Sequence, residues 1–152
     1  MEFGEFEARL AGVRAEREGA GLPEGFQLFD FQRASGVDLD RAEGELRVRL
    51  PEKYKEFMRQ YGGGEFLYLD VLPAVSDGED DLLSINQGEL RQSNFIAIAP
   101  VGTGDWWGFV VVDGVCSEQV EFLDHEDGQL HFAASDVLDF LVREGLCAGK
   151  SN

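Results

Sequence analysis

The chain contains two histidines and two cysteines, the residue types that bind zinc or act in nucleophilic catalysis. No CxxC or HxxxH pair is present, and the spacing of the four residues matches no structural zinc pattern. His131 lies in an apolar stretch and His125 in an acidic turn, so each is interpreted as an ordinary structural or surface residue. We therefore predict no metal site from His125, His131, Cys116 and Cys147.

An acidic stretch offers a second pattern with a chemical meaning. Asp77, Glu79 and Asp81 would occupy positions 1, 3 and 5 of an EF-hand calcium loop. Position 6 would then be Leu82 instead of glycine, and position 12 would be Gly88 instead of glutamate. The pattern excludes an EF-hand and leaves at most a weak, adventitious site for a divalent cation.

The glycine-rich stretch Gly102–Gly108 has some likeness to a phosphate-binding loop. A dinucleotide loop leads into a helix, whereas here the strand-like run Phe109–Val112 follows, and the spacing is one residue longer than GxGxxG. The patterns GxxxxGK[ST], GxSxG and HExxH are absent. We predict that the chain is not an enzyme, has no catalytic residues and binds no cofactor. An enzyme or small-ligand binder that uses this loop and a concave sheet face is kept as the third hypothesis.

The balance of charge is unusual. The chain has 152 residues, which suits one domain, and its 13 Lys and Arg stand against 30 Asp and Glu, for a net charge of −17. Residues 1–60 hold 13 acidic and 10 basic residues, whereas residues 61–152 hold 17 acidic and 3 basic residues. This excludes nucleic acid and membranes as partners, because cations bind both. The acidity is read either as a solvated surface or as a face that meets a cationic partner.

The N-terminus has neither the basic region nor the apolar core of a secretion signal. No apolar run reaches the length of about 18 residues that a membrane span requires. Two cysteines are too few for a disulfide scaffold. We therefore expect a cytoplasmic protein.

Two helices are predicted from apolar residues spaced three and four positions apart. The first stripe ends at Gly19–Gly21. The second follows Pro51, which suits a first helical position, and ends at Gly62–Gly64, which offers a left-handed C-cap. The stripes consist of Phe3, Phe6, Leu10 and Val13, and of Tyr54, Phe57, Met58 and Tyr61.

Capping residues predict two further helices. Asp40 and Glu43 resemble a capping box, with Asp in place of Ser or Thr, so this helix is predicted to begin at Asp40. The closing helix is predicted to have Ser135 as its N-cap and Asp136 in its first turn, and to end at Gly145.

Between the third and the last helix the apolar residues have the composition and spacing of strands. Asp113-Gly114 and Asp127-Gly128 separate consecutive runs and predict antiparallel hairpins. Adjacent strand residues face opposite sides, so we expect one of Trp106 and Trp107 in the core, unless both pack under the glycine-rich loop. Helices followed by a sheet and one more helix indicate an α+β fold. The predicted strands are 66–71, 94–99, 109–112, 119–123 and 130–132.

Several short motifs follow one another in a familiar order. Leu50–Met58 followed by Tyr61–Phe66 resembles an LPxxYxxFL…YNGG signature, with Gly62 where asparagine is usual, and Phe95–Ala99 followed by Gly102–Asp105 resembles I-x-I-A…G-x-G-D. Both are motifs of the SUKH superfamily, the Smi/Knr-like proteins, and the resemblance covers roughly residues 38–144.

The resemblance implies an α+β single domain in which helices pack on one curved antiparallel sheet. It divides the chain into an N-terminal helix and connecting segment (1–37), the SUKH-like domain (38–146) and a tail (147–152). It also implies a non-enzymatic immunity protein, which binds and neutralises a cognate toxin of a polymorphic toxin system, a basic protein of nuclease or deaminase type. The alternative is an intracellular protein–protein adaptor of the same fold with no toxin partner.

A nuclease toxin is usually basic where it grips phosphate, so carboxylates presented to it compete with nucleic acid as phosphate mimics. An aromatic side chain would anchor the centre of such an interface. The sequence leaves the oligomeric state open. The predicted partner-binding set is Glu65, Asp77, Glu79, Asp80, Asp81, Asp105, Trp106 and Trp107.

Overall fold

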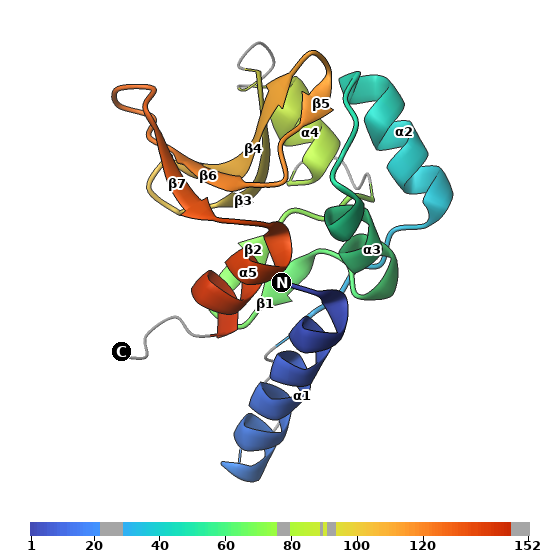
Figure 1. Cartoon of the computed structure of the whole chain (residues 1–152), viewed down its shortest axis with the longest axis vertical. Coiled ribbons are helices and arrows are strands. Elements are labelled where there is room, and N and C mark those ends of the chain that lie inside the picture. Colours follow the sequence, from blue (N-terminus) through green and yellow to red (C-terminus); the bar gives the residue numbers. More distant parts are fainter. Residues whose placement is uncertain (22–28, 76–79, 89, 91–93, 147–152) are drawn as a thin grey trace.

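The computed structural model describes residues 1–21, 29–75, 80–88, 90 and 94–146 (Figure 1). The predicted tail 147–152, and Cys147 with it, lie outside these ranges. No helix within them is both long enough and apolar enough to cross a lipid bilayer. The helices are α1 (Phe3–Gly19), α2 (Gly36–Leu46), α3 (Glu52–Gln60), α4 (Leu82–Gln87) and α5 (Val137–Phe140), and α5 continues into a π-helical turn, η1 (Leu141–Leu146).

The strands of the described residues form two antiparallel sheets. β1 and β2 pair with each other, and the larger sheet has the order β3-β4-β6-β7, with β5 paired to β4. The predicted α+β class is confirmed, and so are hairpins at both predicted turn dipeptides. The strands are β1 (Gly64–Phe66), β2 (Leu69–Val71), β3 (Phe95–Pro100), β4 (Trp106–Val112), β5 (Val115–Cys116), β6 (Val120–Leu123) and β7 (Leu130–Ala134).

α1 belongs to the same hydrophobic core as the rest of the described chain. Its predicted stripe buries Phe6 and Leu10 completely or nearly so, at 0% and 2% exposed. The Phe6 ring lies 5.8 Å from the ring of Phe57 on α3 and 6.2 Å from that of Phe66 on β1. Figure 1 shows α1 at the opposite end of the molecule from the larger sheet, with α5 and the β1–β2 hairpin between them.

Two of the three consecutive glycines after α3 have backbone angles that favour glycine, and all three approach other backbone closely. Gly62 and Gly64 have φ of +98° and +119°. A Cβ at Gly62 would overlap the carbonyl oxygen of Gln32, and one at Gly64 would overlap that of Asp30. This close approach lets the segment before α2 pair with the chain at the start of β1, where Gln32 N donates to the carbonyl oxygen of Gly63 at 2.7 Å. The glycines therefore do more than end α3, since they also let two distant backbone segments come together.

Both helices predicted from caps begin at other residues than expected. α2 starts four residues before Asp40, because Ser35 is its N-cap and forms a reciprocal capping box with Asp38. α5 is capped by Asp136 instead of Ser135, since the Asp136 carboxylate accepts from Asp139 N at 2.8 Å. The closing helix also runs past Gly145, which is buried in η1.

Three further features of the described chain differ from the predictions. The run 66–71 was predicted as one strand, but it folds into the β1–β2 hairpin because Leu67 adopts a left-handed turn conformation with φ of +54°. α4 was not predicted at all, since six residues are too few for a helical period to stand out. Pro51 is the N-cap of α3 instead of its first residue.

The side chain of Asn86 joins α4 to β3. Its Nδ2 donates to the carbonyl oxygens of Leu82 and Ala97, each at 2.9 Å, and its Oδ1 accepts from Ala97 N at 2.8 Å. Asn86 is 4% exposed and Ala97 is fully buried. One amide thus satisfies backbone groups at the edge of the larger sheet that water cannot reach.

We predict that Asn86→Ala lowers the free energy of unfolding by about 2–4 kcal/mol, because it leaves two buried backbone groups of Ala97 without partners. Urea unfolding followed by circular dichroism measures this. Gln87→Ala, at the next and exposed position of α4, is the matched control and should change stability by less than about 0.5 kcal/mol. Equal losses in the two variants would contradict the role given to Asn86.

Candidate functional site

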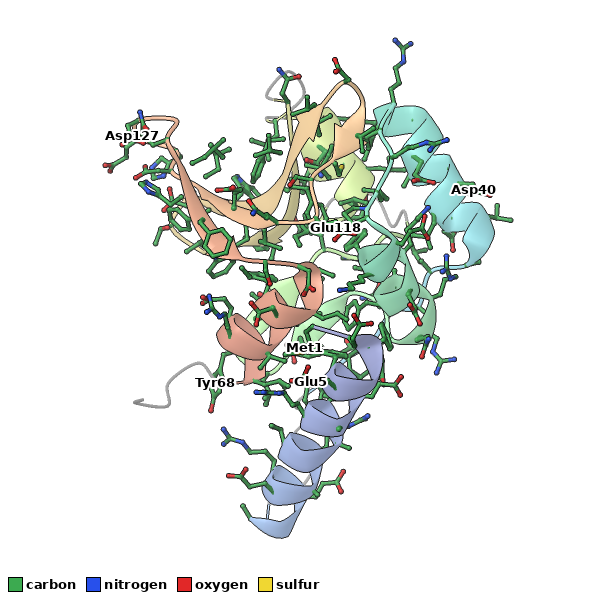
Figure 2. All side chains as sticks on the ribbon, viewed as in Figure 1. Met1, Glu5, Asp40, Tyr68, Glu118 and Asp127 are labelled. Carbon is green, nitrogen blue, oxygen red and sulfur yellow. The ribbon has the colours of Figure 1, made fainter. Side chains whose placement is uncertain are left out.

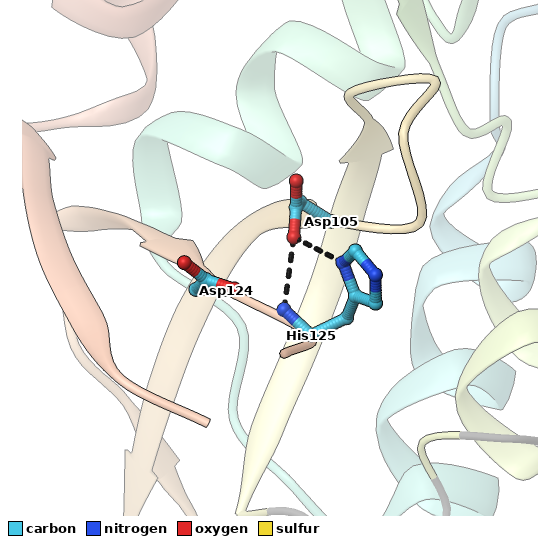
Figure 3. A group of neighbouring side chains, drawn as sticks. All are labelled: Asp105, Asp124 and His125. Atoms are coloured by element: carbon cyan, nitrogen blue, oxygen red, sulfur yellow. Dashed lines mark hydrogen bonds and ion pairs between the residues drawn. The ribbon is translucent and has the colours of Figure 1, made fainter. Parts of the chain in front are cut away.

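The turn before β4 and the turn after β6 are joined by Asp105 and His125. The antiparallel register places Trp106 opposite Leu123, so the residues that flank them meet beyond the strand ends. Asp105 Oδ1 accepts from the backbone N of His125 at 2.8 Å and lies 2.6 Å from its Nδ1 (Figure 3). Asp105 Oδ2 accepts from Thr103 Oγ1 at 2.6 Å. The carboxylate is therefore used to hold two turns together.

These contacts shift the ionisation of both partners. Hydrogen bonds from the Thr103 hydroxyl, then from the backbone and ring of His125, lower the pKa of Asp105 to about 2. The bond to Asp105 in turn raises the pKa of His125, and the charges of Glu126 and Asp124 add to this effect. The pair is thus favoured as carboxylate and imidazolium, with Nδ1 as the donor.

Asp124 lies beside this pair, and the ligand atoms of Asp105, Asp124 and His125 fall within 4.8 Å of one another (Figure 3). A cation bound there would have to displace hydrogen bonds to Asp105, which already accepts from the Thr103 hydroxyl and from the backbone N and Nδ1 of His125. The arrangement is that of a turn held by hydrogen bonds. The sequence had placed His125 among ordinary residues and missed its bond to Asp105, since 20 positions separate them. The register of β4 and β6 is the signal that would have shown it.

The two tryptophans lie on opposite faces of the larger sheet, as strand alternation predicted. The ring of Trp107 packs on Phe140 of α5 at a centroid distance of 5.3 Å and near Phe122 at 6.4 Å, so it belongs to the core side. Trp106 faces the other way and is half-buried beside Leu123. Of the two rings, Trp107 packs against the core and Trp106 lies on the opposite face.

The predicted acidic residues that the structure describes differ in exposure and in role. Asp77 and Glu79 lie outside the described residues, and Asp80 is exposed. Asp81 is 1% exposed, and its carboxylate caps α4 by accepting from Ser84 N at 2.8 Å. The Asp81 carboxylate therefore serves as a helix cap, and the Asp105 carboxylate holds two turns together.

Glu65 lies in the smaller sheet. It is exposed on β1 and pairs across the hairpin with Asp70, which is also exposed. Two carboxylates at directly opposed positions repel each other, so this hairpin has a local acidic character that favours contact with a cation. It belongs to a different sheet from Asp105 and Trp106.

An apolar surface that the sequence did not predict lies on the face of the larger sheet that bears Trp106. The register sets Trp106, Leu123 and Leu130 in one row across β4, β6 and β7, and Glu121 and Phe132 in the next row. Leu130 and Phe132 are 44% and 59% exposed, although both are large and apolar. We call this surface the outer sheet face and define it as Trp106, Glu121, Leu123, Leu130 and Phe132.

A family model described as SMI1-KNR4 cell-wall, SUKH_6, matches residues 37–141. The chain belongs to this SUKH family. The match begins within α2, takes in every strand of the larger sheet and ends at the start of η1, so the outer sheet face lies within the family's region of the chain. The resemblance drawn from the LP and glycine motifs is thereby confirmed. α1 lies outside the match although it packs in the same core. No curated protein sequence matches the chain.

We predict that Asp105→Asn lowers the pKa of His125, because it removes the carboxylate that stabilises the imidazolium. A histidine whose pKa is raised by folding stabilises the fold at pH values below its unfolded pKa of about 6.5, and this contribution fades as pH rises through the folded pKa. The stabilisation from the ionised Asp105 is lost at acidic pH instead, as pH falls below about 4 towards the folded-state pKa of Asp105, which is about 2.

NMR titration of the His125 ring protons measures this shift directly. Glu126→Gln is the matched control, since Glu126 is exposed and acts on His125 through charge alone. The fall in the His125 pKa should be larger for Asp105→Asn than for Glu126→Gln. An unchanged pKa in Asp105→Asn would show that the two side chains do not interact in solution.

Proposed function

We propose that this SUKH protein is an immunity protein, which binds a cognate protein toxin and neutralises it without catalysing a reaction. The observation that supports this most strongly is family membership over residues 37–141, since SUKH proteins are commonly immunity proteins of polymorphic toxin systems. The partner in this proposal is a toxin with a basic surface, of nuclease or nucleic-acid deaminase type.

The distribution of charge supports a cationic partner. Residues 94–134, which include the whole larger sheet, hold seven acidic residues and no lysine or arginine. A toxin that grips nucleic acid through cations would be attracted to such a region, and its association would be fast and sensitive to salt. Among the predicted contact residues, exposed Glu65 and Asp80 and half-buried Trp106 keep that role in the proposal.

Rescue from toxicity tests this function. The chain is co-expressed with the product of the reading frame adjacent to its gene, and we expect growth to be restored only when the chain is present. If the adjacent-gene product remains toxic although the chain is well expressed, the immunity function is contradicted and the adaptor of the same fold is favoured.

The charge of the partner is tested separately, by measuring the dissociation constant of the same pair between about 50 and 300 mM salt. We expect the complex to weaken at least about tenfold over this range, because exposed charges are screened at the higher ionic strength. Sucrose at matched osmolality is the control for non-ionic effects. If the chain rescues growth but its affinity does not change with salt, the immunity function stands and the proposal that the partner has a basic surface is contradicted.

A further inference from the structure

We propose that the outer sheet face is the surface on which the toxin docks, and that it receives an apolar side chain flanked by lysine or arginine. This inference rests on the proposed function and names the part of the chain that performs it. The predicted acidic loop would then be a secondary contact. The first support is that this face carries exposed apolar side chains on β7, whereas Trp107 and Phe109 of β4 pack in the core on the opposite face.

The core side is packed at β4, whereas β7 exposes Leu130 and Phe132 on the outer side and His131 on the other side. On the core side, Trp107 packs on α5 through Phe140. On the other side, Leu130 and Phe132 leave 44% and 59% of their surface in water, so no described segment covers this end of the sheet. Neighbouring exposed apolar side chains on one surface are uncommon in monomeric proteins and mark interaction sites. Trp106 adds a half-buried aromatic ring to the same row, as an interface centre requires.

Glu121 gives the outer sheet face its charge preference. It is half-buried between Gly108, which has no side chain, and Phe132. The ion pairs formed within the described part of the chain do not include Glu121. A carboxylate held in an apolar surface is a directional acceptor for an incoming guanidinium or ammonium group. The face therefore offers apolar contact and one fixed negative charge together.

The surroundings of the face strengthen this preference. Asp124, Glu126 and Asp127 lie in the β6–β7 turn, directly beyond the row that ends in Leu130, and Glu126 and Asp127 are exposed. Figure 2 shows Asp127 at the tip of this hairpin, which projects from the body of the molecule. The Asp105–His125 contact holds the base of the turn. The acidic rim is thus presented on a braced hairpin, which lowers the entropic cost of binding.

The same charges argue against a second copy of this chain as the occupant. Two outer sheet faces placed together would bring Glu121 and the acidic turn of each copy near those of the other, with no lysine or arginine between residues 92 and 142 to offset them. Like charges at an interface disfavour association. A basic protein surface satisfies both the apolar and the acidic parts of the face.

The test uses the purified adjacent-gene product and measures its dissociation constant with variants of the full chain. Phe132→Ser should weaken binding by about 30-fold or more, as expected for loss of an interface anchor. Glu121→Gln should weaken it by about tenfold and make the remaining affinity less dependent on salt. Leu130→Ser is a second apolar variant, and thermal unfolding checks that each variant folds.

The matched controls come from α2, on the other side of the molecule (Figure 2). Val37→Ser removes an apolar side chain that is 77% exposed, and Asp40→Asn removes an exposed carboxylate. Both should change the dissociation constant by less than about threefold.

The outcomes separate this inference from the function on which it rests. If the wild-type chain binds the adjacent-gene product but folded Phe132→Ser, Leu130→Ser and Glu121→Gln bind equally well, the docking surface lies elsewhere and the immunity function stands. If the wild-type chain does not bind it, the proposed function itself fails. If the free chain forms a dimer in light scattering that Phe132→Ser dissociates, the occupant is a second copy and the inference is overturned.

Discussion

The antiparallel register between β4 and β6 decides which side chains this protein buries and which it presents. With Trp106 opposite Leu123 and Trp107 opposite Phe122, one row faces α5 and the other faces water. A slip of one residue would exchange the two faces, because strand side chains alternate with a period of two. The Asp105–His125 contact lies at the end of this pairing and ties the two turns that would have to move.

The contacts described above lie on the core side of the larger sheet, at its β3 edge and in the core beyond α5. Asn86 satisfies the buried edge of β3, and the α1 stripe with the glycines after α3 builds an aromatic core around Phe66. Asn86 acts at the sheet edge, and the aromatic core lies at the other end of the molecule (Figure 1). The outer sheet face receives no described cover, and in a protein of the SUKH family such a surface has a natural interpretation as a partner site.

Sequence reasoning succeeded where one local signal dominated. The stripe of Tyr54, Phe57 and Met58 predicted α3, and its burial is complete. It failed where the answer depended on contacts between distant residues. In the sequence Asp81 does not differ from the other acidic residues near it. Its role as the N-cap of α4 appears only in the structure, because α4 is too short to give a periodic signal. The sequence could not predict the outer sheet face, because the pairing of β6 with β7 is irregular. Val120 pairs with Ala134, but Glu121 pairs with Phe132 and Ala133 has no partner on β6.

Much of the acidity of the chain belongs to residues 94–134, which include the larger sheet and hold seven acidic residues and no lysine or arginine. The most direct measurement of this account is amide hydrogen exchange of the full chain, free and bound to the adjacent-gene product. The account predicts slowed exchange in β6, β7 and the turn between them, together with protection at Trp106. Protection confined to the β1–β2 hairpin or α2, with β6 and β7 exchanging as in the free chain, would contradict it.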